Sequence, residues 1–235
     1  MMILALESSA TACSVALARD GELIAHAFQH SGLTHSRTLL PMVNNVLTSC
    51  GQSMENVDVV AVAAGPGSFT GLRIGVATAK GLAWAGEKDC AACSTLESMA
   101  WPLAHMDGKV IICAMDARRS QVYNAIFLAK EGKLERLSED RAISLADLAE
   151  EVKNIENEKI VVGDGAKLCY NTLTEMGIPM TLAPEHLRMQ SGWGVARAAQ
   201  ELAEKGQLMK SEQLNAVYHR LSQAERERME KQKNT

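Results

Sequence analysis

The chain has 235 residues, of which 47% are hydrophobic and 22% charged, and its formal net charge at pH 7 is −4. This composition excludes a disordered, collagen-like or disulfide-scaffold protein, and the length allows one large domain or two small lobes. The negative balance provides no global field that attracts nucleic acid or anionic lipid, so a nucleic-acid role needs a local patch or a partner.

The first half of the sequence predicts a hairpin, a third strand and two helices. Two apolar runs flank a polar turn that begins at Glu7, which is typical of buried strands joined as a hairpin. Apolar residues then recur with a helical period in two later segments, and each segment ends at a glycine. The expected elements are strands over 2–6, 13–18, 22–29 and 57–64, helices over 34–50 and 70–85, and a short strand near Ala91 followed by a helix from Ser94.

The second half repeats this order, and Asp116 takes the place in its hairpin that Glu7 has in the first. The expected elements are strands over 110–115, 122–129 and 159–162, a strand from Lys133, a helix from Ser144 to about Lys153, and a helix opened by Gly163-Asp164-Gly165. The repeat predicts an α/β fold of two duplicated lobes around a cleft, with mixed sheets flanked by helices. We expect an N-terminal lobe over 1–107, a C-terminal lobe over 108–220 and a charged tail over 221–235.

A glycine-rich segment joins the strand over 57–64 to the following helix. It reads Gly65-Pro66-Gly67-Ser68-Phe69-Thr70-Gly71-Leu72-Arg73. The glycine spacing does not match a dinucleotide fingerprint, and no Lys-Ser/Thr pair of a phosphate loop follows. Pro66 also stands where a nucleophile elbow needs glycine. These departures favour a structural role in which the glycines permit a sharp turn and tight helix packing.

Histidines and cysteines offer weak signals for metal or redox chemistry. His26 and His30 lie on a predicted strand, where four residues span ~13 Å, too far to share one ion. Cys90 and Cys93 have the spacing of a redox dithiol, yet their apolar surroundings favour buried thiols. No catalytic or metal-binding residue is assigned. Glu7, Asp116, Gly163, Asp164 and Gly165 either hold a metal-bound nucleotide, as an intact site or a remnant, or cap their own turns.

Nothing in the sequence indicates export or membrane insertion. No apolar run reaches the ~18 residues of a membrane span, and no basic segment precedes the first strand. The six cysteines are scattered, mostly in apolar runs, as reduced core thiols are. We therefore expect a cytoplasmic protein.

The long segment from Val57 to Ala83, which contains the glycine-rich motif, closely resembles the bacterial TsaB (YeaZ) family. The segments from Met115 to Tyr123 and from Val162 to Gly165 are similar to that family as well. The resemblance implies the actin, sugar-kinase and Hsp70-like (ASKHA) fold, which agrees with the repeated order of elements. It also implies no cofactor for this chain, with ATP or ADP and metal on partner subunits.

The resemblance further implies a non-catalytic subunit in the synthesis of tRNA N6-threonylcarbamoyladenosine. Its partner is TsaD, a paralogue that transfers threonylcarbamoyl to the adenosine next to the anticodon of ANN-decoding tRNAs. TsaD carries a His-x-x-x-His metal pair, whereas this sequence has His35 followed by Leu39 at the second position. One imidazole cannot hold a catalytic metal alone. The expected partners are TsaD in a heterodimer, TsaE through that dimer, tRNA through the complex, and a second copy when the chain is alone.

Apolar stripes on the two expected helices provide candidate contacts with TsaD. We expect Leu39→Glu or Ile74→Glu to leave the chain folded and to abolish that association. The candidate interface residues are Leu39, Leu40, Val43, Val46, Leu47, Thr70, Ile74, Ala77, Thr78 and Leu82.

Two other functions stay open at this stage. One is an ATP-dependent small-molecule kinase or a metallopeptidase-like enzyme of the same fold. The other is a direct tRNA-binding module that uses Arg118, Arg119 and the basic residues of the tail.

Overall fold

Each lobe of the chain is built on a mixed sheet, as the computed structural model shows for residues 1–118 and 120–219. The tail over 221–235 and Arg119 lie outside the described residues. In the first sheet the strand order is β3-β2-β1-β4-β5, with β1 antiparallel to β2 and parallel to β4. The elements are β1 (Met2–Glu7), β2 (Cys13–Arg19), β3 (Glu22–Gln29), α1 (His35–Ser49), β4 (Val59–Gly65), α2 (Phe69–Ala85) and β5 (Asp89–Ser94).

The second sheet repeats this arrangement, which confirms the predicted duplication. Its order is β11-β10-β6-β7-β8, with β6 antiparallel to β7 and parallel to β10, and β9 pairs with β7. Its elements are β6 (Val110–Asp116), β7 (Gln121–Lys130), β8 (Lys133–Arg136), β9 (Arg141–Ser144), α4 (Leu145–Val152), β10 (Lys159–Val162), α5 (Ala166–Glu175) and β11 (Thr181–Leu182).

Three further helices lie outside the two repeated sets. They are α3 (Thr95–Ala100), α6 (Glu185–Arg188) and α7 (Gly192–Glu204), and the 3-10 turns are η1 (Met54–Asn56), η2 (Trp101–Leu103) and η3 (Ser211–Gln213). The sequence analysis did not anticipate β9, β11, α6 or α7. The first three have two to four residues, too few for a periodic signal.

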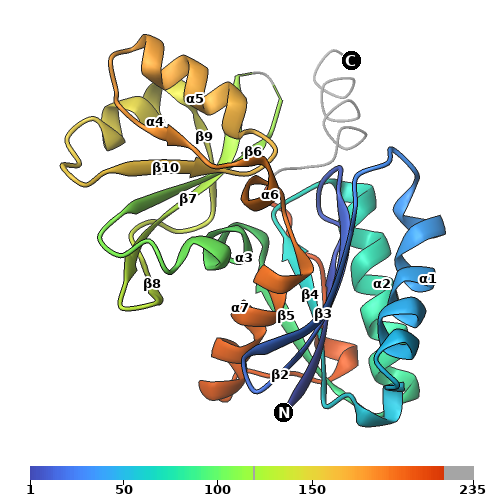
Figure 1. Cartoon of the computed structure of the whole chain (residues 1–235). Helices are drawn as coiled ribbons and strands as arrows, with labels where there is room; N and C mark the ends of the chain where they lie inside the picture. The colour runs from blue at the N-terminus through green and yellow to red at the C-terminus, as the bar shows by residue number, and fades with distance from the viewer. Residues whose placement is uncertain (119, 220–235) are drawn as a thin grey trace, which may run out of the picture.

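The helices α1 and α2 cover one face of the first sheet, and α7 covers the other (Figure 1). Val195 and Ala199 of α7 are buried with Ile3 and Ala5 of β1. After the second lobe the chain therefore returns to the first lobe. The helix α7 packs on the first lobe, although the expected C-terminal lobe over 108–220 includes its residues. Among residues 1–118 and 120–219, no helix has the length and apolar character needed to cross a membrane.

The glycine-rich motif packs against the turn of the first hairpin. A Cβ at Gly71 would lie 2.1 Å from the carbonyl oxygen of Ser8, and one at Gly67 would lie 2.6 Å from the carbonyl oxygen of Ser9. The Ser8 hydroxyl donates to the carbonyl of Gly71, and the Ser68 amide donates to the carbonyl of Ser9. The motif thus lets α2 approach the hairpin closely, in agreement with the structural role predicted for its glycines.

Candidate functional site

The first candidate site is the outward-facing surface of the helices α1 and α2 in the N-terminal lobe. Leu40 on α1 is 53% exposed and Trp84 at the end of α2 is 72% exposed, which is unusual for such large apolar side chains. We call this surface the helix-pair face. Its exposed residues are Ser36, Arg37, Leu40, Pro41, Asn44, Asn45, Thr48 and Ser49 of α1, and Thr70, Arg73, Ala77, Gly81, Trp84 and Ala85 of α2.

The structure corrects part of the predicted interface. Leu40, Thr70 and Ala77 are exposed on the helix-pair face, and Ile74, Thr78 and Leu82 are half-buried at its edge. Four others pack inside the lobe against the sheet, with exposures of 1–5%, and they cannot contact a partner in the folded chain: Leu39, Val43, Val46 and Leu47. The apolar stripe of α1 is the side that covers its own sheet, and periodicity alone cannot separate that side from a docking side.

Gly81 is a residue of this surface that the sequence analysis missed. A Cβ at this position would meet no atom of the described residues within 4 Å, so none of them requires glycine there. Glycine in a helix interior costs about 1 kcal/mol relative to alanine. Gly81 and Ala77 together form a low surface beside the exposed Trp84, and another helix can approach closely there. The signal was present in the sequence as a glycine in the middle of a predicted helix.

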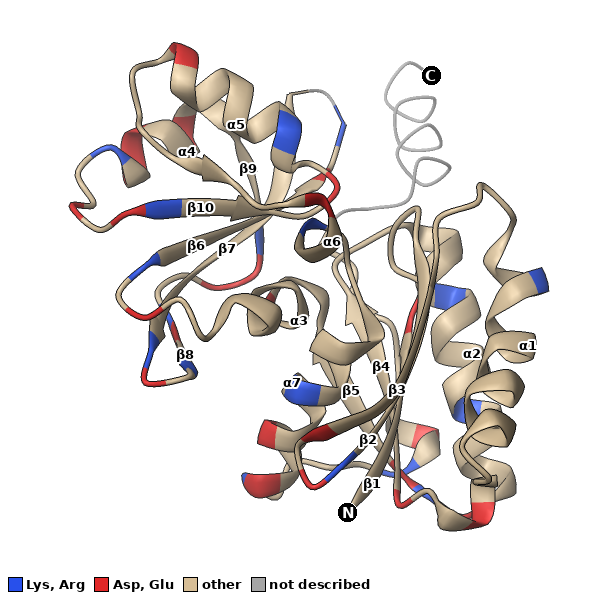
Figure 2. Cartoon of the chain, in the orientation of Figure 1, with Lys and Arg blue, Asp and Glu red and all other residues tan. Residues whose placement is uncertain are grey.

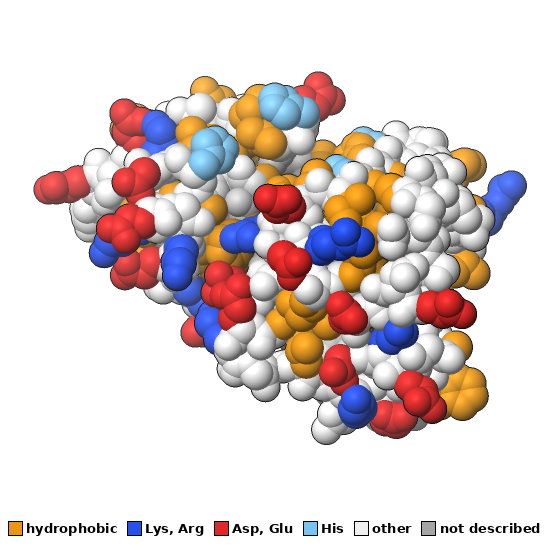
Figure 3. Space-filling view, turned by 60° about the horizontal axis from the view of Figure 1, so that its bottom comes forward, with side chains coloured by type: hydrophobic (Ala, Val, Ile, Leu, Met, Phe, Trp, Pro, Cys, Tyr) orange, Lys and Arg blue, Asp and Glu red, His pale blue; other side chains and the backbone are white. Residues whose placement is uncertain are grey.

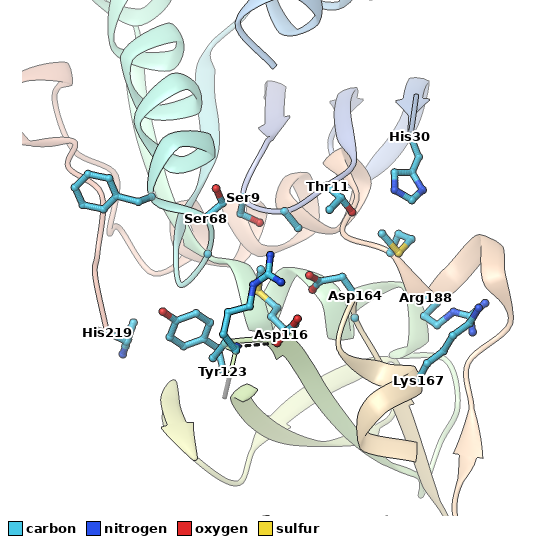
Figure 4. Close-up of a pocket in the computed structure, with 18 of the residues that line it drawn as sticks. Ser9, Thr11, His30, Ser68, Asp116, Tyr123, Asp164, Lys167, Arg188 and His219 are labelled. Atoms are coloured by element: carbon cyan, nitrogen blue, oxygen red, sulfur yellow. Dashed lines mark hydrogen bonds between the residues drawn. The ribbon is translucent and has the colours of Figure 1, made fainter. Parts of the chain in front are cut away.

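A second feature is a cavity of about 810 Å³ between the two lobes (Figure 4). Ser9 and Thr11 of the first hairpin face it from one lobe, and Asp116, Asp164 and Lys167 face it from the other. The structure thus brings Asp116, Gly163 and Asp164 together around one cavity, as their equivalent places in the two repeats predict.

Glu7 lies at the end of β1, near this cavity, and is fully buried. One carboxyl oxygen accepts a hydrogen bond from the Ser9 amide at 2.6 Å, and the other has no partner among the described residues. The pKa of Glu7 is raised to about 7, chiefly by burial and to a smaller extent by the charge of nearby Asp164, while hydrogen bonding to Ser9 opposes the rise. Burial also raises the pKa of Asp164, while the Gln190 side chain donates to that carboxyl at 2.7 Å.

Glu7, Asp116 and Gly165 make local contacts within the chain. Glu7 is fully buried, and its carboxylate accepts a hydrogen bond from the Ser9 amide. Neither this carboxylate nor the Ser9 amide is therefore available to a phosphate group. Asp116 accepts from the amide of Arg118 at 2.7 Å, which is the turn-capping interpretation made from the sequence. A Cβ at Gly165 would lie 2.8 Å from the Asp116 amide, so this glycine serves close packing against β6.

Two of the histidines, His26 and His35, have local structural partners. The His26 ring pairs with the Ser14 hydroxyl at 2.7 Å, and the His35 ring donates to the carbonyl of Ala10 at 2.7 Å. Within residues 1–118 and 120–219, no group of three or more His, Cys, Asp or Glu side chains is placed to hold a metal ion.

The thiols of Cys90 and Cys93 should resist alkylation while the chain is folded. Both side chains are buried, and burial raises the pKa of Cys90 to about 11 and that of Cys93 further. Iodoacetamide labelling followed by mass spectrometry should modify Cys50, which is partly exposed, well before either of them. The expectation is contradicted if all three cysteines are labelled at equal rates in native buffer and if denaturant does not accelerate the labelling of Cys90 and Cys93.

Comparison with known proteins gives consistent matches over most of the chain. The family model described as TsaD, tRNA N6-adenosine threonylcarbamoyltransferase, matches residues 29–228. The Bacillus subtilis tRNA threonylcarbamoyladenosine biosynthesis protein TsaB is 36% identical over 168 residues, which cover 72% of this chain and 73% of that protein. The Escherichia coli TsaB is 36% identical over 167 residues, with coverages of 70% and 72%.

Solved structures agree with these sequence matches. A Pseudomonas aeruginosa protein described as similar to the peptidase YEAZ has a TM-score of 0.81 and 26% identity, and the match covers 93% of this chain and 99% of that one. The ROK hexokinase of Thermus thermophilus has a TM-score of 0.50 at 11% identity over 88% of this chain and 100% of that one, which shows the shared ASKHA fold alone. The repeated lobes, the glycine-rich motif and these matches together show that the chain belongs to the TsaB (YeaZ) family.

Proposed function

We propose that this chain is a non-catalytic subunit in the biosynthesis of tRNA N6-threonylcarbamoyladenosine, acting in the cytoplasm. It docks on TsaD, and TsaD performs the transfer of threonylcarbamoyl to the adenosine next to the anticodon. The names of the TsaB relatives and the match to the TsaD family model support the pathway. The observation that carries the docking role is the helix-pair face, where Leu40, Gly81 and Trp84 are exposed and no contact among the described residues accounts for their side-chain types.

The absence of a second histidine after His35 supports a non-catalytic role. Leu39 occupies that position and is 1% exposed in the core of the lobe, and the His35 ring is engaged with a backbone carbonyl. A metal needs at least three protein ligands in a catalytic site of the zinc type. TsaE then joins through the TsaB–TsaD dimer, and the chain pairs with a second copy through the same face when TsaD is absent.

Reconstituted transfer to tRNA tests this proposal directly. The reaction contains TsaD, TsaE, the adenylate-forming enzyme, ATP, bicarbonate and threonine, with this chain present or omitted. We expect modified tRNA only when the chain is present, and none when it replaces TsaD. Equal product with and without the chain contradicts the proposal. Micromolar ATP binding by the isolated chain, measured by calorimetry, supports the kinase alternative instead.

Gly81 gives a prediction in which stability and binding move in opposite directions. Gly81→Ala should stabilise the isolated chain by up to about 1 kcal/mol, because alanine is the better helix former and its Cβ meets no atom. Gly81→Leu should remain folded and weaken binding to TsaD, because its side chain separates the two helices. Thermal unfolding and calorimetric titration check both results. Unchanged affinity of folded Gly81→Leu removes this part of α2 from the interface.

A further inference from the structure

The charges on the helix-pair face have one sign. The sequences of α1 and α2 contain Arg37, Arg73 and Lys80 but no aspartate or glutamate, although the whole chain has a net charge of −4. Figure 2 shows the same pattern, with Lys and Arg colour on both helices and no Asp or Glu colour along them. On the face in Figure 3, by contrast, residues of both signs are interspersed. The single sign is therefore a local property of this surface.

The positive end of this surface lies at the helix N-termini. Arg37 is in the first turn of α1 and Arg73 is in the second turn of α2, where the helix macrodipole adds positive potential. The acidic residues nearest in the chain, Glu55 and Glu87, come after the opposite ends of α1 and α2. A partner carboxylate that meets Arg73 therefore encounters no acidic side chain of either helix.

Arg73 is held in one orientation by two aromatic side chains. Its guanidinium lies 3.9 Å from the ring centroid of Phe69, and its Nε donates to the hydroxyl of Tyr218 at 3.3 Å. The rings of Phe69 and Tyr218 are in contact, with centroids 4.7 Å apart. Among the described residues, the two terminal nitrogens of Arg73 have no acceptor. The result is an exposed, pre-oriented guanidinium fork, the geometry that binds carboxylates with two parallel hydrogen bonds.

Tyr218 is itself positioned by the backbone of the last described segment. The Val217 amide donates to the carbonyl of Ala64 at 2.7 Å, and Leu214 is fully buried in the core of the first lobe. A Cβ at Gly65 would lie 2.2 Å from the carbonyl oxygen of Val217, so only glycine at this place admits the segment. The family motif therefore also positions Tyr218. Gly65 admits the segment that carries Tyr218, and the Phe69 ring and the Arg73 side chain contact it.

We infer that the helix-pair face selects an acidic protein surface, with the Arg73 fork binding a carboxylate of the partner. The inference rests on the proposed docking on TsaD and adds the chemistry of that contact. A second copy of this chain presents the same two exposed arginines, with the half-buried Lys80, and no carboxylate on the matching helices, so pairing with itself brings like charges together. The face thus favours a different, acidic partner over a second copy.

Salt should affect the two associations in opposite directions. Raising sodium chloride from about 0.05 M to about 0.5 M shortens the screening length severalfold, which weakens attraction and relieves repulsion between exposed charges. Calorimetric titration with TsaD should show affinity falling by about tenfold or more. Sedimentation of the chain alone should show self-association that is unchanged or stronger. Both associations responding to salt in the same direction overturns the inference.

Charge reversal at Arg73 gives the residue-level test. Arg73→Glu should lower affinity for TsaD by about tenfold or more and should not weaken self-association, whereas Lys133→Glu, an exposed change of equal charge on β8, should alter neither. Tyr218→Phe removes only the hydrogen bond to Nε and should give a smaller loss. Circular dichroism checks that Arg73→Glu is folded. If this variant unfolds, Arg73→Lys replaces it in the binding test, because lysine keeps the charge but not the fork.

The outcomes separate this inference from the proposed function. Wild-type chain that does not bind TsaD at any salt concentration contradicts the proposed function. Normal binding by Arg73→Glu and Arg73→Lys, together with loss of binding by Gly81→Leu, keeps the docking role and overturns the acidic contact. Loss of tRNA binding by Arg73→Glu, with TsaD binding intact, assigns the fork to phosphate and also overturns it.

Discussion

Leu39→Glu should unfold the N-terminal lobe, whereas Leu40→Glu should leave the chain folded and abolish binding to TsaD. The two leucines are neighbours on α1, yet Leu39 is 1% exposed and Leu40 is 53% exposed. A carboxylate at position 39 would be buried among the apolar side chains of β2 and α1 without a partner, at a cost of about 4 kcal/mol or more. That cost approaches the whole stability of an ordinary domain, about 5–15 kcal/mol.

Thermal unfolding and binding to TsaD, measured on both variants, check this pair. The sequence analysis expected Leu39→Glu to remain folded; burial makes that expectation wrong and moves the useful substitution to Leu40. Leu168→Glu, at an exposed leucine on α5 of the second lobe, is a control for adding a carboxylate to a helix outside the helix-pair face. Normal TsaD affinity of folded Leu40→Glu removes α1 from the docking surface.

Glu7→Gln should remove a pH dependence of stability that belongs to the cavity region. The pKa of Glu7 is about 7 in the folded chain, against an ordinary value of 4.5, because the carboxyl is buried and lies near Asp164. The unfolded chain therefore releases this proton at lower pH than the folded chain does. As pH rises from about 4.5 to about 7, the folded state loses about 3 kcal/mol relative to the unfolded state.

The glutamine variant carries no such proton, so its stability relative to wild type should increase by about 3 kcal/mol over that range. Denaturant unfolding at a series of pH values measures the difference. Glu135→Gln, at an exposed position on β8, should show no comparable trend. A difference between Glu7→Gln and wild type that stays constant from pH 4 to pH 8 means that Glu7 titrates normally.

Much of the fold followed from local pattern. The strands β1, β2, β4 and β6 are buried segments of mostly apolar residues, and each lies within two residues of its predicted range. The polar turns that begin at Glu7 and Asp116 recur at equivalent places, which allowed the duplication to be recognised before any contact was known. The structural role of the glycine-rich segment was also predictable, since its spacing excludes the known ligand motifs.

The candidate site was less accessible, because it depends on which side of each element remains uncovered. Leu39 and Leu40 are chemically identical, and only the position of the first sheet decides that one is core and the other surface. The packing of α7 on the first lobe could not be predicted for the same reason, because its small apolar residues are compatible with either sheet.

The sequence by itself determined the two lobes, their strand order within the hairpins and membership of the TsaB family, because these depend on local periodicity and on contiguous motifs. Tertiary structure alone decided that Arg73 meets Tyr218, 145 residues away along the chain. It also decided that Glu7 is buried beside Asp164, which raises the Glu7 pKa. Such contacts join segments distant in sequence, and their energies depend on distance and burial, which a linear pattern of residue types does not contain.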